Sequence, residues 1–154
     1  MGGKIKVVKD IENKMDAYAV HLADCVVLTH DNKLLLQRRP DNWRTYPGRV
    51  NIFGGHIEEG ETIVEGLKRE LHEELGVSID DNDLLFIGAL TEEETDYTEA
   101  VHIYFWHDKT GSITGCYEAE PIYFANVEEA LSHTKIMDYT VWAIKECQKK
   151  NLIT

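Results

Sequence analysis

Residues 55–77 read GHIEEGETIVEGLKRELHEELGV, and the second half of this stretch has the features of one amphipathic helix. Apolar residues recur at helical spacing across residues 62–75. Thr62 and Glu65 have the spacing of a capping box, and Gly76 is a typical residue for a helix end. The stretch therefore predicts a helix over residues 62–75.

Three carboxylates of this helix, Glu70, Glu73 and Glu74, lie on one strip of its surface. At about 100° per residue, Glu73 and Glu74 fall within roughly 60° of Glu70, beside the apolar face that would pack on a sheet. Like charges at these spacings weaken a helix by a few tenths of a kcal/mol each, so a compensating partner is expected. Carboxylate oxygens suit Mg²⁺ and Mn²⁺, although a solvated acidic face would show the same spacing. The pattern around the helix has to decide between these two interpretations.

The composition is that of one globular domain without a membrane segment. The chain has 154 residues, of which 43% are hydrophobic and 29% charged, so we expect a single domain over residues 1–154. No apolar run approaches the roughly 18 residues that span a bilayer, and the polar N-terminus lacks the apolar core of a signal peptide. A net charge of −12 argues against a nucleic-acid partner, which needs a basic face.

The cysteines indicate a reducing compartment. Cys25, Cys116 and Cys147 are scattered and form no CxxC motif, so neither a disulfide framework nor a zinc site is predicted. We therefore expect a cytoplasmic protein with no membrane partner. The sequence leaves the oligomeric state open, with a homodimer among the states considered.

Hydrophobic patterning predicts a mixed α/β or α+β fold. Strands are expected at residues 17–29, 33–39, 49–53, 84–91, 100–107 and 121–125. Asn126 is expected to cap a short helical turn, and an amphipathic helix is expected from Asp138 onward. Its inward residues would be Val141, Trp142, Ile144 and Cys147. Because strands and helices alternate in this order, we expect helices packed on a sheet.

The stretch also fits a longer pattern, G-x5-E-x7-R-E-U-x-E-E-x-G-U, where U is an aliphatic residue. Its fixed positions are filled by Gly55, Glu61, Arg69, Glu70, Leu71, Glu73, Glu74, Gly76 and Val77. In this respect the chain resembles the Nudix hydrolase family, and the order of elements around the pattern is similar along nearly the whole chain. The resemblance implies an α/β/α sandwich with a mixed sheet flanked by helices. It also implies metal-assisted hydrolysis of a small molecule, a nucleoside diphosphate linked to another group.

The resemblance assigns the chemistry to the acidic strip of this Nudix box, as residues 55–77 are called below. Glu70, Glu73 and Glu74 match the metal-binding and general-base positions of the family, and the residue that serves as base varies between members. The backbone carbonyl of Gly54 matches a further metal contact. The implied cofactor is Mg²⁺ or Mn²⁺.

Other residues are expected to complete or support this site. A further acidic ligand often comes from a later strand or loop, and Glu118 is the first candidate, with Glu120 close behind. Gly55, Glu61 and Arg69 match positions that support the box, the last two through an ion pair that orients it.

Candidate substrate contacts lie outside the box. Arg39 matches a phosphate-contacting position of bacterial members that clean the nucleotide pool. The run N-I-F-G-G that begins at Asn51 resembles a run that lines the base pocket of animal oxidised-purine nucleoside triphosphatases, which makes Asn51, Phe53 and Asp138 candidate base contacts. The chain departs from that branch at Ile136, where a stacking tryptophan would fall.

The expected activity is Mg²⁺-dependent cleavage of a nucleoside triphosphate, modified or oxidised in some members, to a monophosphate and pyrophosphate. Two alternatives stay open. One is hydrolysis of a nucleotide sugar or another nucleoside diphosphate derivative, since the box is common to both groups. The other is a non-catalytic ligand sensor on the same fold, although such proteins tend to lose the box carboxylates that are all present here.

Overall fold

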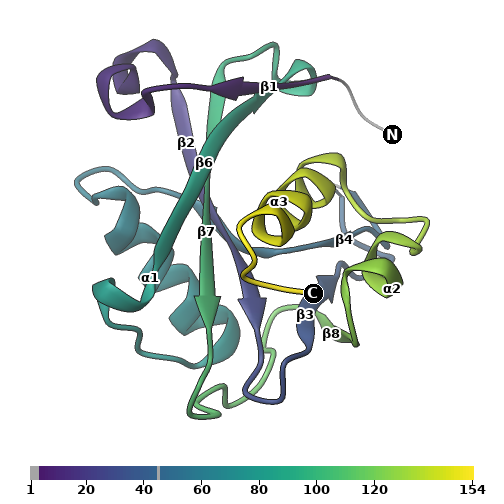
Figure 1. Cartoon of the computed structure of the whole chain (residues 1–154). Coiled ribbons are helices and arrows are strands. Elements are labelled where there is room, and N and C mark those ends of the chain that lie inside the picture. Colours follow the sequence, from purple (N-terminus) through teal and green to yellow (C-terminus); the bar gives the residue numbers. More distant parts are fainter. Residues whose placement is uncertain (1–3, 45) are drawn as a thin grey trace.

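The computed structural model describes residues 4–44 and 46–154, which fold into one mixed sheet covered by helices (Figure 1). The described strands are β1 Ile5–Val8, β2 Val20–Leu28, β3 Leu34–Arg38, β4 Val50–Asn51, β5 Phe53–His56, β6 Leu85–Glu92, β7 Glu99–His107 and β8 Glu120–Phe124. The described α-helices are α1 Ile63–Leu75, α2 Val127–Leu131 and α3 Asp138–Lys149. No helix in the described part of the chain is long and apolar enough to cross a membrane.

The sheet forks at β2, and this fork positions the site. The main strand order is β1-β6-β7-β2-β3-β4, with β2 parallel to β7. The first half of β2 pairs with β5, where Asp24 lies opposite Gly54, whereas the end of β2 pairs with β3. The two arms of the fork are joined through Ile52, the single residue between β4 and β5. Segments from β2, β3, β4 and β5 therefore meet at one place.

Each face of the sheet carries its own apolar cluster, because alternate residues of β2 point to opposite faces. The cluster under α1 includes Ala23, Cys25, Val27, Leu35, Phe53, Leu67, Leu71 and Leu75. The cluster under α3 includes Val26, Leu28, Leu34, Leu36, Val50, Ile52, Ile144 and Cys147. In Figure 1, α1 and α3 lie on opposite sides of β2, β6 and β7. The predicted α/β/α sandwich with a mixed sheet is therefore confirmed.

The predicted helix over residues 62–75 is confirmed together with both of its ends. Thr62 is the N-cap, and the two hydrogen bonds of the capping box with Glu65 are present. Gly76 ends the helix with a left-handed conformation, φ 68°. Asn126 caps α2 as expected, through a hydrogen bond from the Glu129 amide.

Other boundaries differ from the prediction. The expected strand at residues 49–53 is two short strands, β4 and β5, because the chain crosses from one arm of the fork to the other at Ile52. The strand β1 was not predicted, because an edge strand that pairs only with β6 needs little apolar patterning, and Val7 is 53% exposed. On α3, Val141 and Trp142 are only partly buried and pack at the margin of the core.

Candidate active site

Glu74 is the buried carboxylate of the acidic strip. Its side chain leaves α1 at the edge of the core and is 5% exposed. The amide of Gly54 donates to its Oε1 at 2.8 Å, and the side-chain amide of Gln37 donates to its Oε2 at 3.4 Å. Burial, reinforced by the charges of Asp24 and Glu70, raises the pKa of Glu74 to about 9. Glu74 is therefore fixed in orientation, and no cation is among the described residues that hydrogen-bond to it.

Glu70 is half-buried one turn earlier. Arg69 Nη1 donates to its Oε1 at 2.9 Å, but burial outweighs this pairing and raises the pKa of Glu70. Gly55 lies directly beside it: a Cβ at this position would come within 2.7 Å of the Glu70 carboxyl carbon. The glycine of the box thus makes room for the second carboxylate.

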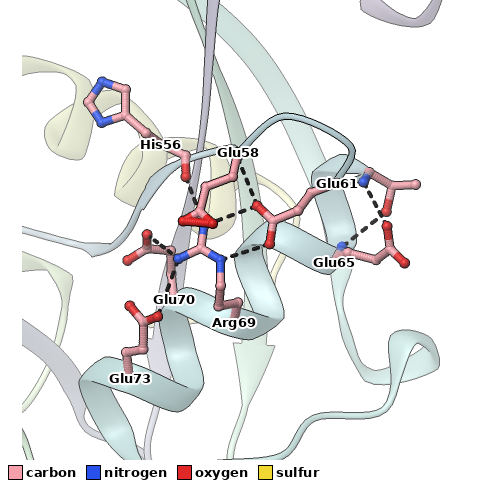
Figure 2. Close-up of polar contacts among 8 residues, drawn as sticks. His56, Glu58, Glu61, Glu65, Arg69, Glu70 and Glu73 are labelled. Atoms are coloured by element: carbon pink, nitrogen blue, oxygen red, sulfur yellow. Dashed lines mark hydrogen bonds and ion pairs between the residues drawn. The ribbon is translucent and has the colours of Figure 1, made fainter.

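Arg69 ties the loop of the box to the helix (Figure 2). Its guanidinium binds both carboxylate oxygens of Glu61, at 2.7 and 3.1 Å, and donates to the carbonyl of His56 at 3.0 Å. The hydrogen bonds from Arg69 to Glu61 lower the pKa of Glu61. The ion pair expected between these two residues is therefore present. Glu73, the most exposed carboxylate of the strip, lies 3.4 Å from Arg69 Nη1.

Asp24 is a candidate site residue that the sequence analysis did not predict. It lies on β2 opposite Gly54, is 4% exposed, and contributes to the raised pKa of Glu74. Burial, followed by the charges of Glu70 and Glu92, raises the pKa of Asp24 to about 8 despite a hydrogen bond with Tyr139. The one available signal was a single carboxylate within the otherwise apolar run of β2.

A buried polar chain connects Asp24 to the predicted substrate contact Asn51. The Tyr139 hydroxyl on α3 hydrogen-bonds to Asp24 and accepts a hydrogen bond from Asn51 Nδ2 at 3.0 Å. Asn51 is 6% exposed, and its Oδ1 has no partner among the described residues. The structure thus brings Asn51 to the fork, next to the carboxylates.

Two further substrate candidates lie around this polar chain. Arg39 stacks on the ring of Trp43, with its guanidinium carbon 4.4 Å from the ring centre, and its charge acts on Asp24. Asp138 is the first residue of α3, and its charge helps to raise the pKa of the half-buried Glu92 to about 7, an effect dominated by burial.

Phe53 and Ile136 are both buried in the core, so neither offers a surface on which a base could stack. Phe53 has no exposed area and belongs to the apolar cluster under α1, so its ring is part of the core. This burial contradicts the expected contact between Phe53 and a base. Side chains alternate between the two faces along β5, and this alternation turns Phe53 toward α1. Ile136 is 5% exposed and packs in the cluster under α3.

The structure distinguishes between Glu118 and Glu120, the two candidates for an additional acidic ligand near β8. The charge of Glu118 contributes to the raised pKa of both Glu70 and Glu74, which indicates that it lies near the acidic strip. Glu120 instead forms an ion pair with Arg38, with 3.7 Å between its Oε2 and Arg38 Nη1. Glu118 is therefore the better placed of the two as an additional metal ligand.

A divalent metal fits the donor set, although the side chains are not gathered around one point. Within residues 4–44 and 46–154, no three His, Cys, Asp or Glu side chains are close enough together to hold a metal ion as they stand. The set nevertheless consists of hard oxygen donors with an excess of partly desolvated negative charge, which is what Mg²⁺ and Mn²⁺ require. Glu73 and Glu118 are surface side chains whose rotamers are not fixed by core packing.

Comparison with known proteins agrees with this geometry. The sequence model of the NUDIX domain matches residues 20–145. Over 79 residues, 50% of this chain and 49% of that protein, the chain is 42% identical to an oxidized purine nucleoside triphosphate hydrolase of Mus musculus. Over 101 residues, 61% of this chain and 48% of that protein, it is 34% identical to an isopentenyl-diphosphate Delta-isomerase of Rhizobium rhizogenes. The chain thus spans about half the length of these curated relatives.

A solved structure shows the same fold. A MutT protein from Methanosarcina mazei Go1 superposes with a TM-score of 0.70 over 86% of this chain and 94% of that chain, at 21% sequence identity. Because the family match covers most of the chain and includes the whole acidic box, the chain belongs to the Nudix family.

Proposed function

We propose that the chain hydrolyses a nucleoside triphosphate to a nucleoside monophosphate and pyrophosphate with the help of a divalent metal. The observation that carries this proposal is the buried Glu74 side chain, which two donors hold and which has no cation among the described residues that hydrogen-bond to it. Such an arrangement is costly in a protein that never binds a cation there. Membership of the Nudix family gives the diphosphate chemistry.

The residues that would hold the metal are the carboxylates of the acidic strip, Glu118 and the Gly54 carbonyl. When bound, Mg²⁺ or Mn²⁺ would neutralise phosphate charge and lower the pKa of a water molecule. Glu74 suits the role of a fixed ligand because donors hold both of its oxygens.

Glu70 is the carboxylate that we assign as general base. It is half-buried with a raised pKa, and a base works best when its pKa approaches the working pH. Arg69 holds one of its oxygens and so orients the side chain. Glu73 remains a candidate metal ligand at the exposed end of the strip.

The substrate side is assigned to residues around the fork. Arg39 would contact phosphate, and Asn51 and Asp138 would contact the base. The relative named as an oxidized purine nucleoside triphosphate hydrolase supports a nucleoside triphosphate as substrate. Ile136 and Phe53 offer no stacking surface, so we assign no preference for oxidised purines.

A substrate panel with Mg²⁺ tests the proposal. It should include ordinary and oxidised nucleoside triphosphates, nucleotide sugars, dinucleoside polyphosphates and isopentenyl diphosphate, with products identified by mass spectrometry. We expect equimolar pyrophosphate and monophosphate from a triphosphate, and no turnover in EDTA. Turnover of nucleotide sugars alone would favour the second hydrolase class. Binding without turnover of any compound, by folded protein, would favour a ligand sensor and overturn the proposal.

A further inference from the structure

Gln37 lies outside the Nudix box, yet it contacts the buried carboxylate of the box. It is on β3, two residues after Leu35, which belongs to the cluster under α1, so both side chains face α1. Gln37 is 7% exposed. Its Nε2 donates to the carbonyl of Ile52 at 3.0 Å and to Glu74 Oε2 at 3.4 Å. One side chain thus links β3, the crossing point of the fork and α1.

The orientation of the Gln37 amide is fixed by its surroundings. The Ile52 carbonyl can only accept a hydrogen bond, and the same would hold for the Glu74 carboxylate when a bound metal keeps it ionised. A flipped amide would place its oxygen against two acceptors. The NH₂ group therefore has to face inward, with one hydrogen for each acceptor.

The result is a carboxylate held at both oxygens by different parts of the fold. Gly54, on β5, binds Glu74 Oε1, and Gln37, on β3, binds Oε2. A glutamate side chain has three rotatable bonds, and two donors from separate strands restrict them to one orientation. In known metal sites, donors of this kind outside the ligand set determine affinity, and their loss typically costs about 10- to 100-fold.

We propose that Gln37 is a positioning residue for the divalent metal, holding Glu74 in the orientation in which it binds the ion. Gln37 does not itself bind the metal or the reacting atoms. This inference rests on the proposed function, because it assumes that Glu74 is a metal ligand.

The test compares Gln37→Met with wild type and with Gln148→Met. Methionine has a similar length but no donor, and Gln148 is an exposed residue of α3, which controls for the substitution itself. The affinity for Mn²⁺ is measured without substrate by electron paramagnetic resonance. Thermal unfolding is measured in EDTA and in Mg²⁺. For Gln37→Met we expect an increase in the Mn²⁺ Kd of about 10-fold or more and a smaller Mg²⁺-induced rise in Tm. Gln148→Met should match wild type.

The alternative is that Gln37 only supports the fold through the Ile52 carbonyl. In that case Gln37→Met would lower Tm equally in EDTA and in Mg²⁺ and leave the Mn²⁺ Kd unchanged, which would overturn the inference alone. A wild-type chain that binds no Mn²⁺ would instead overturn the metal-dependent function, and this inference with it. If Gln37→Met does not fold, Gln37→Asn provides the same measurement, because its shorter side chain cannot reach both acceptors, and an unchanged Kd would again contradict the proposal.

Discussion

Among single residues, Glu74 and Asp24 stand out because both are carboxyl groups whose burial opposes their ionisation. Glu74 and Asp24 are each at most 5% exposed, and after burial itself the charge of Asp24 contributes to the raised pKa of Glu74. The described donors to Glu74 are a backbone amide and a side-chain amide, and Asp24 hydrogen-bonds to the Tyr139 hydroxyl while the charge of Arg39 also acts on it. Burying carboxylates in this way costs several kcal/mol when they ionise, and a bound divalent cation would offset that cost.

Replacing Glu74 tests this account most directly. Glu74→Gln should lower turnover about 100-fold or more, because loss of a metal-dependent stabilisation of several kcal/mol has that effect on a rate. The protein should stay folded in EDTA, since the variant no longer buries an ionisable group. Steady-state kinetics and thermal unfolding would measure both effects. Glu65→Gln, on the solvent side of α1, is the matched control because glutamine also completes a capping box. Near-normal rates for Glu74→Gln would contradict the assignment.

His102 makes a separate residue-scale prediction about acid stability. It is 2% exposed, and its Nε2 lies 2.9 Å from Nδ1 of His21, whose other ring nitrogen lies 2.9 Å from the Met15 carbonyl. Burial, followed by the neighbouring His21, lowers the pKa of His102 from 6.5 to about 4. The unfolded chain therefore binds a proton at higher pH than the folded chain does. The contribution of His102 to stability is present in full above pH 6.5. As the pH falls toward 4 this contribution is lost, and the free energy of unfolding decreases by roughly 3 kcal/mol.

The variant His102→Gln isolates this contribution. Its free energy of unfolding, measured by urea titration, should fall less steeply than that of wild type between pH 6.5 and 4. His56→Gln, at an exposed residue of β5, is the matched control and should keep the wild-type pH dependence. Parallel curves for His102→Gln and wild type would show that His102 titrates normally.

At the scale of elements, α1 carries its acidic strip because other interactions compensate for the repulsion. The capping box supplies two hydrogen bonds at the N-terminus, and Gly76 closes the C-terminus. Arg69 binds Glu61 and Glu70 and so spreads positive charge along the strip. The helix is therefore stable without the metal, and the carboxylates are available for binding it.

The capping box gives a stability prediction for this element. Thr62→Ala removes the hydroxyl that accepts from the Glu65 amide and should cost about 1 kcal/mol. For a chain of this size that corresponds to a fall in Tm of roughly 2–4 °C, measurable by calorimetry. Thr62→Ser keeps the acceptor and should stay close to wild type. An unchanged Tm for Thr62→Ala would mean that the cap contributes nothing to folding.

The packing of β5 against α1 gives an activity prediction. In Gly55→Ala, the new Cβ would come within 2.7–2.8 Å of the Glu70 carboxyl group, the mobile end of its side chain. The side chain can move aside at little cost in stability, but Glu70 then leaves the position from which we propose that it acts as general base. We expect a clear loss of kcat with little change in Tm. A large fall in Tm with normal kcat would instead assign Gly55 a purely structural role.

At the scale of the whole molecule, metal binding should appear as stabilisation of the fold. The net charge is −12, and a cation that binds the folded chain alone stabilises it by about 2.7 kcal/mol at a concentration 100 times its Kd. Mg²⁺ should therefore raise Tm by several degrees. Sodium chloride at equal ionic strength controls for general screening of the acidic surface. If NaCl raises Tm as much as Mg²⁺ does, the chain has no specific site for a divalent cation. If Mg²⁺ raises Tm further than NaCl, Glu74→Gln should abolish this additional rise.

The box helix, its ends and the fold class could be predicted from the amino-acid sequence, because they depend on residues close together in the chain. Capping at Thr62 and Gly76 is local, and so is the spacing that puts Glu70, Glu73 and Glu74 on one strip. Alternating apolar residues were likewise enough to predict a sheet between helices.

The remaining residues of the candidate site could be identified only from the folded chain. Asp24, Gln37 and Tyr139 are distant from the box in sequence and join it because β2 pairs with β5 along one half and with β3 along the other. The same fork turned the predicted strand at 49–53 into β4 and β5 and placed Phe53 in the core. Local spacing cannot specify strand pairing across such separations, because pairing depends on the burial of the whole sheet between α1 and α3.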